Sequence, residues 1–194
     1  MEDLPGLYQV CLQTGDGGAD ATGRFSDPAW LGHRFVGPYV ALEPGFSWTL
    51  EDEAGPCGYV LGTADSLRFS HRFESDWYPR VAGELDLIRR AVPTAPSDLE
   101  FEQRRWFAHR RWEFPQPMEA FPAHLHIDLL PRAQGRGYGV RMVGMLLDAM
   151  RAARVSGVHL VMHPENDRAR RFYLKLGFRT HTRSREAEVL VRDL

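Results

Sequence analysis

The part of the chain that most constrains its fold is residues 123–140, AHLHIDLLPRAQGRGYGV. From His124 to Leu130 polar and apolar residues alternate, which is typical of a strand with one polar and one apolar face, and Pro131 then ends the run. After a glycine-rich turn, apolar residues recur at the spacing of a helix that buries one side, at Val140, Val143, Leu147 and Met150, widened by Met142, Leu146 and Ala153. The sequence therefore predicts a strand, a tight turn and a helix in direct succession.

The turn between that strand and that helix suits an anion. Backbone N–H groups without a partner inside the helix point into the turn at the positive end of the helix dipole, so a phosphate is the natural occupant. A dinucleotide site needs G-x-G-x-x-G, but counting from Gly135 the last position falls on Val140, and no G-K-[ST] is present. The pattern that fits is Q-x-x-G-x-G, formed by Gln134, Gly137 and Gly139.

A second motif stands downstream, after a β-rich run at residues 157–163. The string NDRARRFYLKLGF at residues 166–178 predicts a last helix, with Gly177 just past its end. In their order and spacing, the two motifs resemble those of the GNAT superfamily of N-acetyltransferases. The resemblance covers residues 46–194, apart from an insertion at residues 64–122.

The resemblance implies a single α/β (α+β) domain over residues 1–194. The GNAT fold has a mixed, mostly antiparallel central sheet that is splayed at the cofactor site, with helices on both faces. Residues 64–122 then form a helical, proline-rich insertion before the main cofactor strand. The first strand, which normally precedes the first helix, is missing or cut short, so either the start is misplaced or the sheet has lost an edge.

The resemblance also implies acetyl-CoA as co-substrate. Leu129 and Leu130, at the end of the strand, would offer backbone groups to the pantetheine arm. The loop and the helix N-terminus would hold the pyrophosphate through Gln134, Gly135, Arg136, Gly137, Tyr138, Gly139 and Val140. From the second motif, the cofactor contacts would be Asn166, Phe172 and Tyr173. The implied activity is transfer of an acetyl group to an amine of a small molecule or a peptide.

Acetyl transfer needs a neutral amine, a hydrogen-bond donor for the carbonyl oxygen and a proton for the leaving thiolate. The family supplies that proton from a tyrosine on the last helix, and Tyr173 matches it. The general base is often a carboxylate or a histidine on the strand, or a water relay, which makes Asp128, His126 and His124 the candidates. Asp128 lies closest to the cofactor and is slightly favoured over His126, although a bulge in the strand would exchange the two faces.

The H-x-H-x-D pattern of this strand also admits a metal site, since three ligand types share one face. Acetyl-CoA binding explains the same strand without a metal, and nothing else in the sequence looks like a fourth ligand. No metal is therefore expected.

A narrower resemblance comes from short segments of the chain, which are DLPGLY near the start, GPY, DWYP and FPAHLHID at the strand. They look like the acetyltransferase-like domain at the C-terminus of O-GlcNAcase enzymes and like its free-standing bacterial relatives. In the animal domain the pyrophosphate loop is degenerate, and the domain is regarded as a pseudo-acetyltransferase. This chain keeps Gln134, Gly137 and Gly139. Two hypotheses therefore stand: an active N-acetyltransferase, or a non-catalytic module that binds acyl-CoA or a peptide.

Periodicity and turn residues predict the other elements. Helices are expected at residues 3–14, 27–35, 66–90 (broken near Pro79) and 98–112, the last opened by the capping box Ser97-x-x-Glu100. A hairpin is expected from residues 46–50 and 58–63 with a turn at residues 51–56, and its Tyr59 and Trp48 either face the acyl end of the cofactor or fill the core. Prolines at positions 115, 117 and 122 predict an extended return to the main strand.

Two regions are candidates for the acceptor side. The loop at residues 15–22 carries Asp16 and Asp20, which would suit a cationic amine, although such a loop is more often a solvated turn. In residues 98–112 arginines interleave with aromatic residues. That pattern is compatible with a peptide or nucleic-acid surface, but the balancing acids favour a solvated helix face. The insertion could face a second copy of the chain, in a homodimer, as well as a substrate.

Composition narrows the classes of function. Hydrophobic residues make up 43% of the chain and charged residues 26%, which is ordinary for a globular domain, and a net charge of -2 gives no reason to expect nucleic acid. No apolar run approaches the roughly 18 residues of a membrane span, and the acidic start argues against a signal peptide. Cys11 and Cys57 look like reduced thiols of a cytoplasmic protein, and the free-standing relatives suggest a bacterial one.

Overall fold

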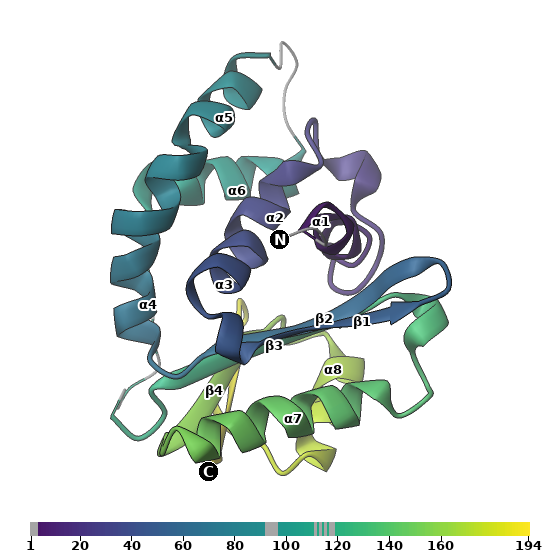
Figure 1. Ribbon diagram of the computed structural model, residues 1–194, viewed down its shortest axis with the longest axis vertical. Helices are drawn as coiled ribbons and strands as arrows, with labels where there is room; N and C mark the ends of the chain where they lie inside the picture. The colour runs from purple at the N-terminus through teal and green to yellow at the C-terminus, as the bar shows by residue number, and fades with distance from the viewer. Residues whose placement is uncertain (1–3, 92–96, 111, 113, 115, 117–118) are drawn as a thin grey trace.

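The computed structural model describes residues 4–91, 97–110, 112, 114, 116 and 119–194 (Figure 1). Its described strands form one mixed sheet with the order β1-β2-β3-β4-β6-β5. Neighbouring strands are antiparallel except for β3 and β4, which are parallel. The predicted mixed, mostly antiparallel sheet is therefore confirmed. The strands are β1 Ser47–Asp52, β2 Gly55–Thr63, β3 Ala123–Leu129, β4 Gly157–Met162, β5 Arg179–Arg183 and β6 Glu188–Asp193.

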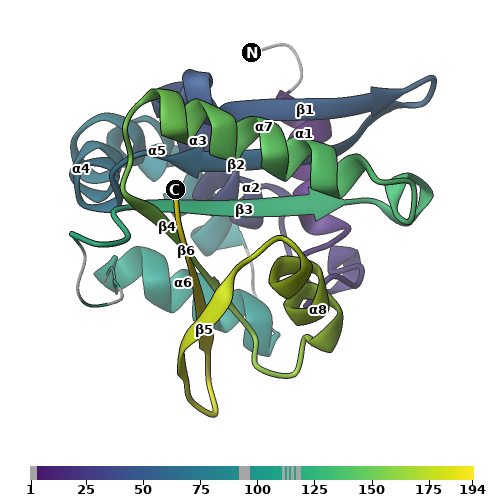
Figure 2. The ribbon, with the colours of Figure 1, turned by 90° about the horizontal axis from the view of Figure 1, so that it is seen from below.

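The sheet splays between β3 and β4. In the described residues these two strands pair only at Ala123 with Val158 and at His124 with His159, whereas β3 stays paired with β2 as far as Leu129. Figure 2 shows β4 running at a steep angle to β3. Beyond His124 the β4 side of β3 is thus an open edge inside the molecule.

The helices lie on both faces of the sheet (Figure 1). One face carries α7 and α8, and the other carries the N-terminal helices. Each face has its own apolar core, and the strands separate the two cores. The helices outside the insertion are α1 Leu4–Leu12, α2 Ala29–Phe35, α3 Gly37–Leu42, α7 Tyr138–Ala152 and α8 Asp167–Lys175, with short 3-10 turns at Thr22–Arg24, Pro44–Phe46 and Pro131–Ala133.

The predicted stripe of α7 packs on the sheet, except for Val140 and for Ala153, which is exposed and lies just beyond the end of the helix. Met142, Val143, Leu146, Leu147 and Met150 are buried. Val140 is 52% exposed, contrary to expectation, because it lies in the first turn, where the helix leaves the open glycine loop. None of the described helices is long and apolar enough to cross a membrane.

The insertion is helical, as predicted, but differs in detail. Its helices are α4 Ser66–Arg72, a π-helical segment Phe73–Trp77, α5 Tyr78–Ala91 and α6 Asp98–His109. The irregularity comes before Pro79 and is a π-turn, and Pro79 itself is tolerated in the first turn of α5. Ser97 caps α6 by accepting from the Glu100 N–H, and the left-handed Arg110 ends the helix before Trp112.

Several elements differ from the sequence prediction. The hairpin turn is shorter than residues 51–56, since β1 continues to Asp52 and β2 begins at Gly55. The short helix α3 and the C-terminal hairpin β5–β6 were not foreseen. The described residues begin at Leu4, the first residue of α1, so the missing or shortened first strand stays a prediction. The prolines at positions 115 and 117 lie outside the described residues, so their extended return stays a prediction.

Candidate functional site

The loop after β3 forms an open cradle at the start of α7. Gly135 and Gly137 have φ angles of 73° and 79°, a left-handed conformation that glycine adopts without strain. Gly137 is the N-cap of α7. A Cβ placed on either glycine would meet no described atom within 4 Å. The first N–H groups of α7 therefore face open space, where a negatively charged group fits.

Gln134, the first residue of the signature, braces this loop. Its amide nitrogen donates to the Leu129 carbonyl at 2.6 Å, and its amide oxygen accepts from Arg168 of α8. Gln134 thus ties β3, the loop and α8 together. Its side chain is committed to the protein, whereas the sequence alone predicted that it would wrap a pyrophosphate.

The end of β3 turns two backbone N–H groups toward the splay. The Leu130 N–H donates to the Cys57 carbonyl at 2.8 Å, and the Leu130 carbonyl accepts from Ala133. Since paired residues alternate along an antiparallel strand, the N–H groups of Ile127 and Leu129 point away from β2. Of the two predicted pantetheine contacts, Leu129 keeps its N–H available, and Leu130 has both backbone groups engaged.

Asp128 is a partly buried carboxylate that β3 places beside the splay. The Tyr59 hydroxyl donates to its Oδ2 at 2.5 Å, and Tyr59 itself is fully buried on β2. Burial raises the pKa of Asp128 to about 6, opposed in part by hydrogen bonds from Tyr59 and Thr14. Among the described residues no arginine or lysine pairs with Asp128. A carboxyl group with such a pKa can exchange a proton near neutral pH.

Tyr173 reaches the same place from α8. Its ring packs edge-on against Phe172 and Phe178, with centroids 5.1 and 5.5 Å away. Burial raises the pKa of Tyr173 well above the ordinary tyrosine value, and the nearby charge of Asp128 raises it further. The hydroxyl therefore carries its proton at neutral pH. Gly139 allows this arrangement, since a Cβ there would lie 3.3 Å from the Phe172 ring.

The two histidines of β3 are partly buried on the face that also carries Asp128. The β2–β3 register runs without a bulge, so the feared exchange of faces does not occur. His124 is held between the hydroxyls of Tyr39 and Ser66, each at 2.7 Å. His126 packs against Tyr39 with ring centroids 4.7 Å apart, and its Nε2 has no partner among the described residues. Burial lowers the pKa of His126 to about 4, so it is neutral at pH 7.

A metal does not fit this strand. Both ring nitrogens of His124 are already hydrogen-bonded. Over the described ranges, no three histidine, cysteine or carboxylate side chains are placed to hold an ion.

Asn166 caps a helix and holds a loop, a structural role that the motif did not predict. Its Oδ1 caps α8 by accepting from the Ala169 N–H at 3.0 Å, and its Nδ2 donates to the Gly17 carbonyl at 3.2 Å. The loop after α1 is therefore fastened to the start of α8. The aspartates of that loop make local contacts, Asp16 with Arg24 and Asp20 with Thr22, as a solvated turn would.

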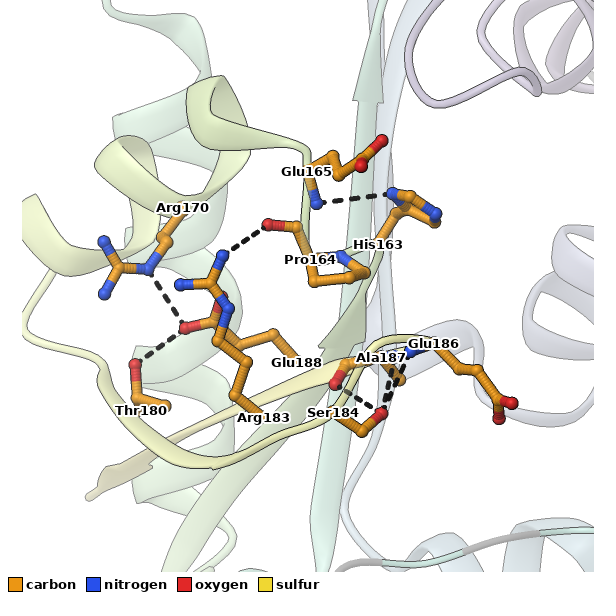
Figure 3. Close-up of polar contacts among 10 residues, drawn as sticks. All are labelled: His163, Pro164, Glu165, Arg170, Thr180, Arg183, Ser184, Glu186, Ala187 and Glu188. Carbon is orange, nitrogen blue, oxygen red and sulfur yellow. Dashed lines mark hydrogen bonds and ion pairs between the residues drawn. The ribbon is translucent and has the colours of Figure 1, made fainter.

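A buried carboxylate that sequence reasoning missed supports α8 from behind (Figure 3). Glu188 is fully buried at the start of β6; its Oε1 accepts from Arg170 at 3.0 Å and from Thr180 at 2.7 Å, and its Oε2 lies 3.5 Å from Arg183. Arg183 also donates to the Pro164 carbonyl at 2.9 Å. These contacts lock the β5–β6 hairpin to α8. The only signal in the sequence is a charged residue at the head of an apolar strand.

A groove lies between α6 and the exposed side of β4, β5 and β6. It has a volume of about 1060 Å³, and we call it the α6 groove. Its main wall and floor residues are Arg34, Phe35, Tyr39, Trp106, Trp112 and Val161. The arginine- and aromatic-rich residues 98–112 were a candidate surface in the sequence. The groove itself could not be predicted, because its other walls come from segments far apart in the chain.

The comparisons with known proteins agree with this geometry. The model of the acetyltransferase (GNAT) family matches residues 101–178. The crystal structure of SsHAT superposes with a TM-score of 0.80 at 36% identity, covering 99% of this chain and 94% of that one. The chain belongs to the GNAT acetyltransferase family. The match also confirms the predicted GNAT fold with helices on both sides of the sheet.

Curated relatives of this GNAT chain include Protein O-GlcNAcase from Rattus norvegicus and from Mus musculus. Each is 27% identical over 179 residues, which are 91% of this chain and 19% of the relative. The chain thus spans about a fifth of their length. A phosphinothricin acetyltransferase from Sinorhizobium meliloti, solved in complex with AcCoA, has a TM-score of 0.57 at 13% identity, covering 100% of this chain and 84% of that one, and shares the fold.

Proposed function

We propose that this GNAT chain is an acetyl-CoA-dependent N-acetyltransferase that acylates an amine of a small molecule or a peptide. The observation that carries the proposal is Asp128, a partly buried carboxylate that has no cationic partner among the described residues and lies at the open edge of β3. The protonated Tyr173 and the glycine cradle flank the same edge. A base, an acid and an anion site thus converge where the sheet opens.

Acetyl-CoA fits the residues that surround the splay. The backbone at Gly135, Arg136, Gly137, Tyr138, Gly139 and Val140 would hold the pyrophosphate at the start of α7. The Leu129 N–H would take a carbonyl of the pantetheine arm in the place of the missing β4 partner. A solved neighbour of the same fold carries AcCoA, which supports this choice.

The side chains divide the proton transfers between them. The amine attacks the thioester carbonyl, and Asp128 takes the proton that the nitrogen loses as the C–N bond forms. The C–S bond then breaks, and Tyr173 gives its proton to the departing thiolate. A base with a pKa near 6 is ionised at pH 7 while still able to accept a proton, and an acid with a raised pKa keeps its proton until sulfur takes it.

His126 and a water relay are the alternatives for the base. With its pKa lowered to about 4, His126 is a weaker base than Asp128 at neutral pH. Its ring also lies among Phe35, Tyr39 and Tyr59. Asp128 is therefore the preferred base.

Calorimetric titration with acetyl-CoA tests the proposal. Micromolar binding is expected for the wild-type chain and none for Gly137→Glu, which puts a charge and a side chain into the cradle. The matched control is Gly144→Glu, which adds the same charge in the middle of α7, where a Cβ meets no described atom within 4 Å. Gly137→Ala separates the cost of the left-handed backbone from that of the charge. Equal binding by Gly137→Glu and the wild type would overturn the cofactor site.

Thiol release with a panel of amines and peptides then separates enzyme from binding module. Acceptor-dependent release supports the transferase, and Tyr173→Phe should slow it without weakening acetyl-CoA binding. Binding without release from any acceptor would favour the alternative, a pseudo-acetyltransferase that binds acyl-CoA or a peptide. The similarity to the O-GlcNAcase relatives gives that alternative its weight.

A further inference from the structure

The α6 groove contains a positive charge, that of Arg34, which no carboxylate of the described residues balances. Arg34 of α2 lies on the groove wall with its guanidinium carbon 4.0 Å from the Trp106 ring centroid and 4.6 Å from that of Phe35. Its hydrogen-bond partner is the neutral Gln103, at 2.8 Å. Among the described residues Arg34 forms no ion pair. Burial lowers its pKa to about 9, yet it stays charged at pH 7.

The other charges on the wall do not compensate Arg34. Arg105 and Glu102 also line the groove, and they pair with each other at 2.8 Å. The described carboxylates near α6 are likewise engaged, Glu100 with Arg104 and Glu74 with Arg110. A partly desolvated cation without an anion is costly, and a ligand carboxylate would relieve that cost. The groove is therefore complementary to an anion.

The shape of the groove favours a chain-like occupant. Its volume of about 1060 Å³ lies at the upper limit of the range of roughly 300–1,000 Å³ that is typical of small-molecule pockets. The aromatic wall comes from α2, α6 and the segment after α6, and the floor is the outer face of β4, where Val161 is 57% exposed. Figure 2 shows how α6 and the β4, β6 and β5 strands lie along one side of the molecule. An extended peptide with several side chains suits such a surface.

The groove adjoins the proposed site of acetyl transfer. Phe35 and Tyr39, which line it, also pack on His126, with ring centroids 6.2 and 4.7 Å apart. Asp128 is two residues further on the same face of β3, about 7 Å along the strand. A peptide in the groove can thus place an amine near Asp128 and a carboxylate near Arg34.

We propose that the α6 groove binds the acceptor as an acidic peptide, with a glutamate or aspartate side chain seated against Arg34. This inference rests on the proposed function, because the peptide is the acceptor of the acetyl group. The preference for an acidic peptide rests on Arg34. The substrate class is then an extended peptide with a carboxylate a few residues away from the acylated amine.

The test measures binding of two labelled hexapeptides to the whole protein by fluorescence anisotropy. The peptides are identical except that one carries glutamates where the other carries glutamines. The glutamate peptide should bind at least about tenfold more tightly, and Arg34→Gln should remove that preference, whereas Arg34→Lys should keep part of it. Thermal melting checks that each variant is folded.

A second variant guards against misfolding of the Arg34 mutants. Val161→Glu adds a negative charge at an exposed position on the groove floor and should abolish binding of the glutamate peptide. Met145→Glu adds the same charge at a residue of α7 that is 48% exposed and lies outside the groove. This variant should leave binding unchanged. Equal binding of the two peptides, no binding of either, or indifference to Arg34→Gln and Val161→Glu would overturn the inference.

The outcome also separates this inference from the proposed function. Acetyl-CoA binding and thiol release with some other amine, without peptide binding, would leave the transferase standing and reject the peptide groove. Arg34-dependent peptide binding without any thiol release would support the groove and reject the transferase.

Discussion

Asp128, which is partly buried, and Glu188, which is fully buried, are both carboxylates of the sheet, yet their surroundings differ in kind. Asp128 receives a hydrogen bond from the Tyr59 hydroxyl and no ion pair from the described residues, and burial raises its pKa to about 6. Burial alone would raise the pKa of Glu188 too. Hydrogen bonds from Thr180 and Arg170 and the charges of Arg170 and Arg183 outweigh that effect and hold the pKa below its ordinary value.

The difference shows how one chemical group can serve two purposes. A carboxylate held by arginines stays ionised over the working pH range and fastens two elements together. A carboxylate held by hydroxyls alone is unstable when ionised and is ready to accept a proton. We therefore assign Glu188 to holding α8 against the β5–β6 hairpin and Asp128 to chemistry, and the following predictions test that division.

The largest effect is expected for Asp128→Asn on catalysis. Removing a general base slows a reaction by roughly 10²–10⁴-fold, so acceptor-dependent thiol release should fall by that factor while acetyl-CoA binding is kept. The matched control is Asp148→Asn on the exposed side of α7, where the loss of an ion pair with Arg151 should change the rate by less than about twofold. A rate within a few-fold of wild type in Asp128→Asn would transfer the base role to His126 or to water.

Glu188→Ala should change the free energy of unfolding by about as much as Asp128→Asn changes the activation free energy of catalysis. It leaves Arg170 and Arg183 without their shared partner and should lower the free energy of unfolding by about 3–5 kcal/mol. Urea titration measures it, with Glu186→Ala in the exposed turn as a control that should stay within about 0.5 kcal/mol. A small loss in Glu188→Ala would show that the clamp is not structural.

In the same urea titration, Asp128→Asn should raise the free energy of unfolding, whereas Glu188→Ala lowers it. Because the folded-state pKa of Asp128 is raised, folding favours its protonated form. The resulting loss of stability therefore grows as the pH rises from the ordinary pKa to the folded-state pKa, and it is complete above the latter. A rise from the ordinary value of 3.8 to about 6 corresponds to about 3 kcal/mol, so the variant should gain up to that amount at pH 8 and nothing below pH 4. A loss of stability at pH 8 would contradict the cost assigned to the buried charge.

The smallest expected effect is a shift in the pH profile. With an aromatic amine acceptor whose own pKa lies below 5, kcat/KM should rise with pH and reach half its plateau near pH 6. Tyr59→Phe removes a hydrogen bond that lowers the pKa of Asp128, so the midpoint should move upward. A profile that is flat between pH 5 and pH 8 in both proteins would argue against Asp128 as the titrating base.

The sequence could predict those elements whose backbone conformation depends on a local pattern of residues. The alternation before Pro131, the glycines at 135, 137 and 139 and the NDRARRFYLKLGF string each specify their own backbone, and β3, the loop, α7 and α8 followed as expected. Asp128 and Tyr173 could be named because they lie inside those motifs. Which partners would surround them could not, since Tyr59 is 69 residues away from Asp128.

The missed features all join distant segments. The clamp around Glu188 combines α8, β5 and β6, and the groove combines α2, α6 and three strands. The π-turn before Pro79 is a matter of how Phe73 and Trp77 pack, which no spacing rule encodes. Such features depend on the assembled core and become visible only in the structure.

The splayed edge of β3 also gives the molecule a built-in readout. The amides of His126 and Asp128 face β2 and should exchange slowly with deuterium, while those of Ile127 and Leu129 face the gap and should exchange quickly. Protection would thus alternate residue by residue along a single central strand. A ligand that supplies the missing strand partner would erase the alternation, so deuterium exchange followed by NMR can report occupancy of the gap at single amides, even for a ligand that never reacts.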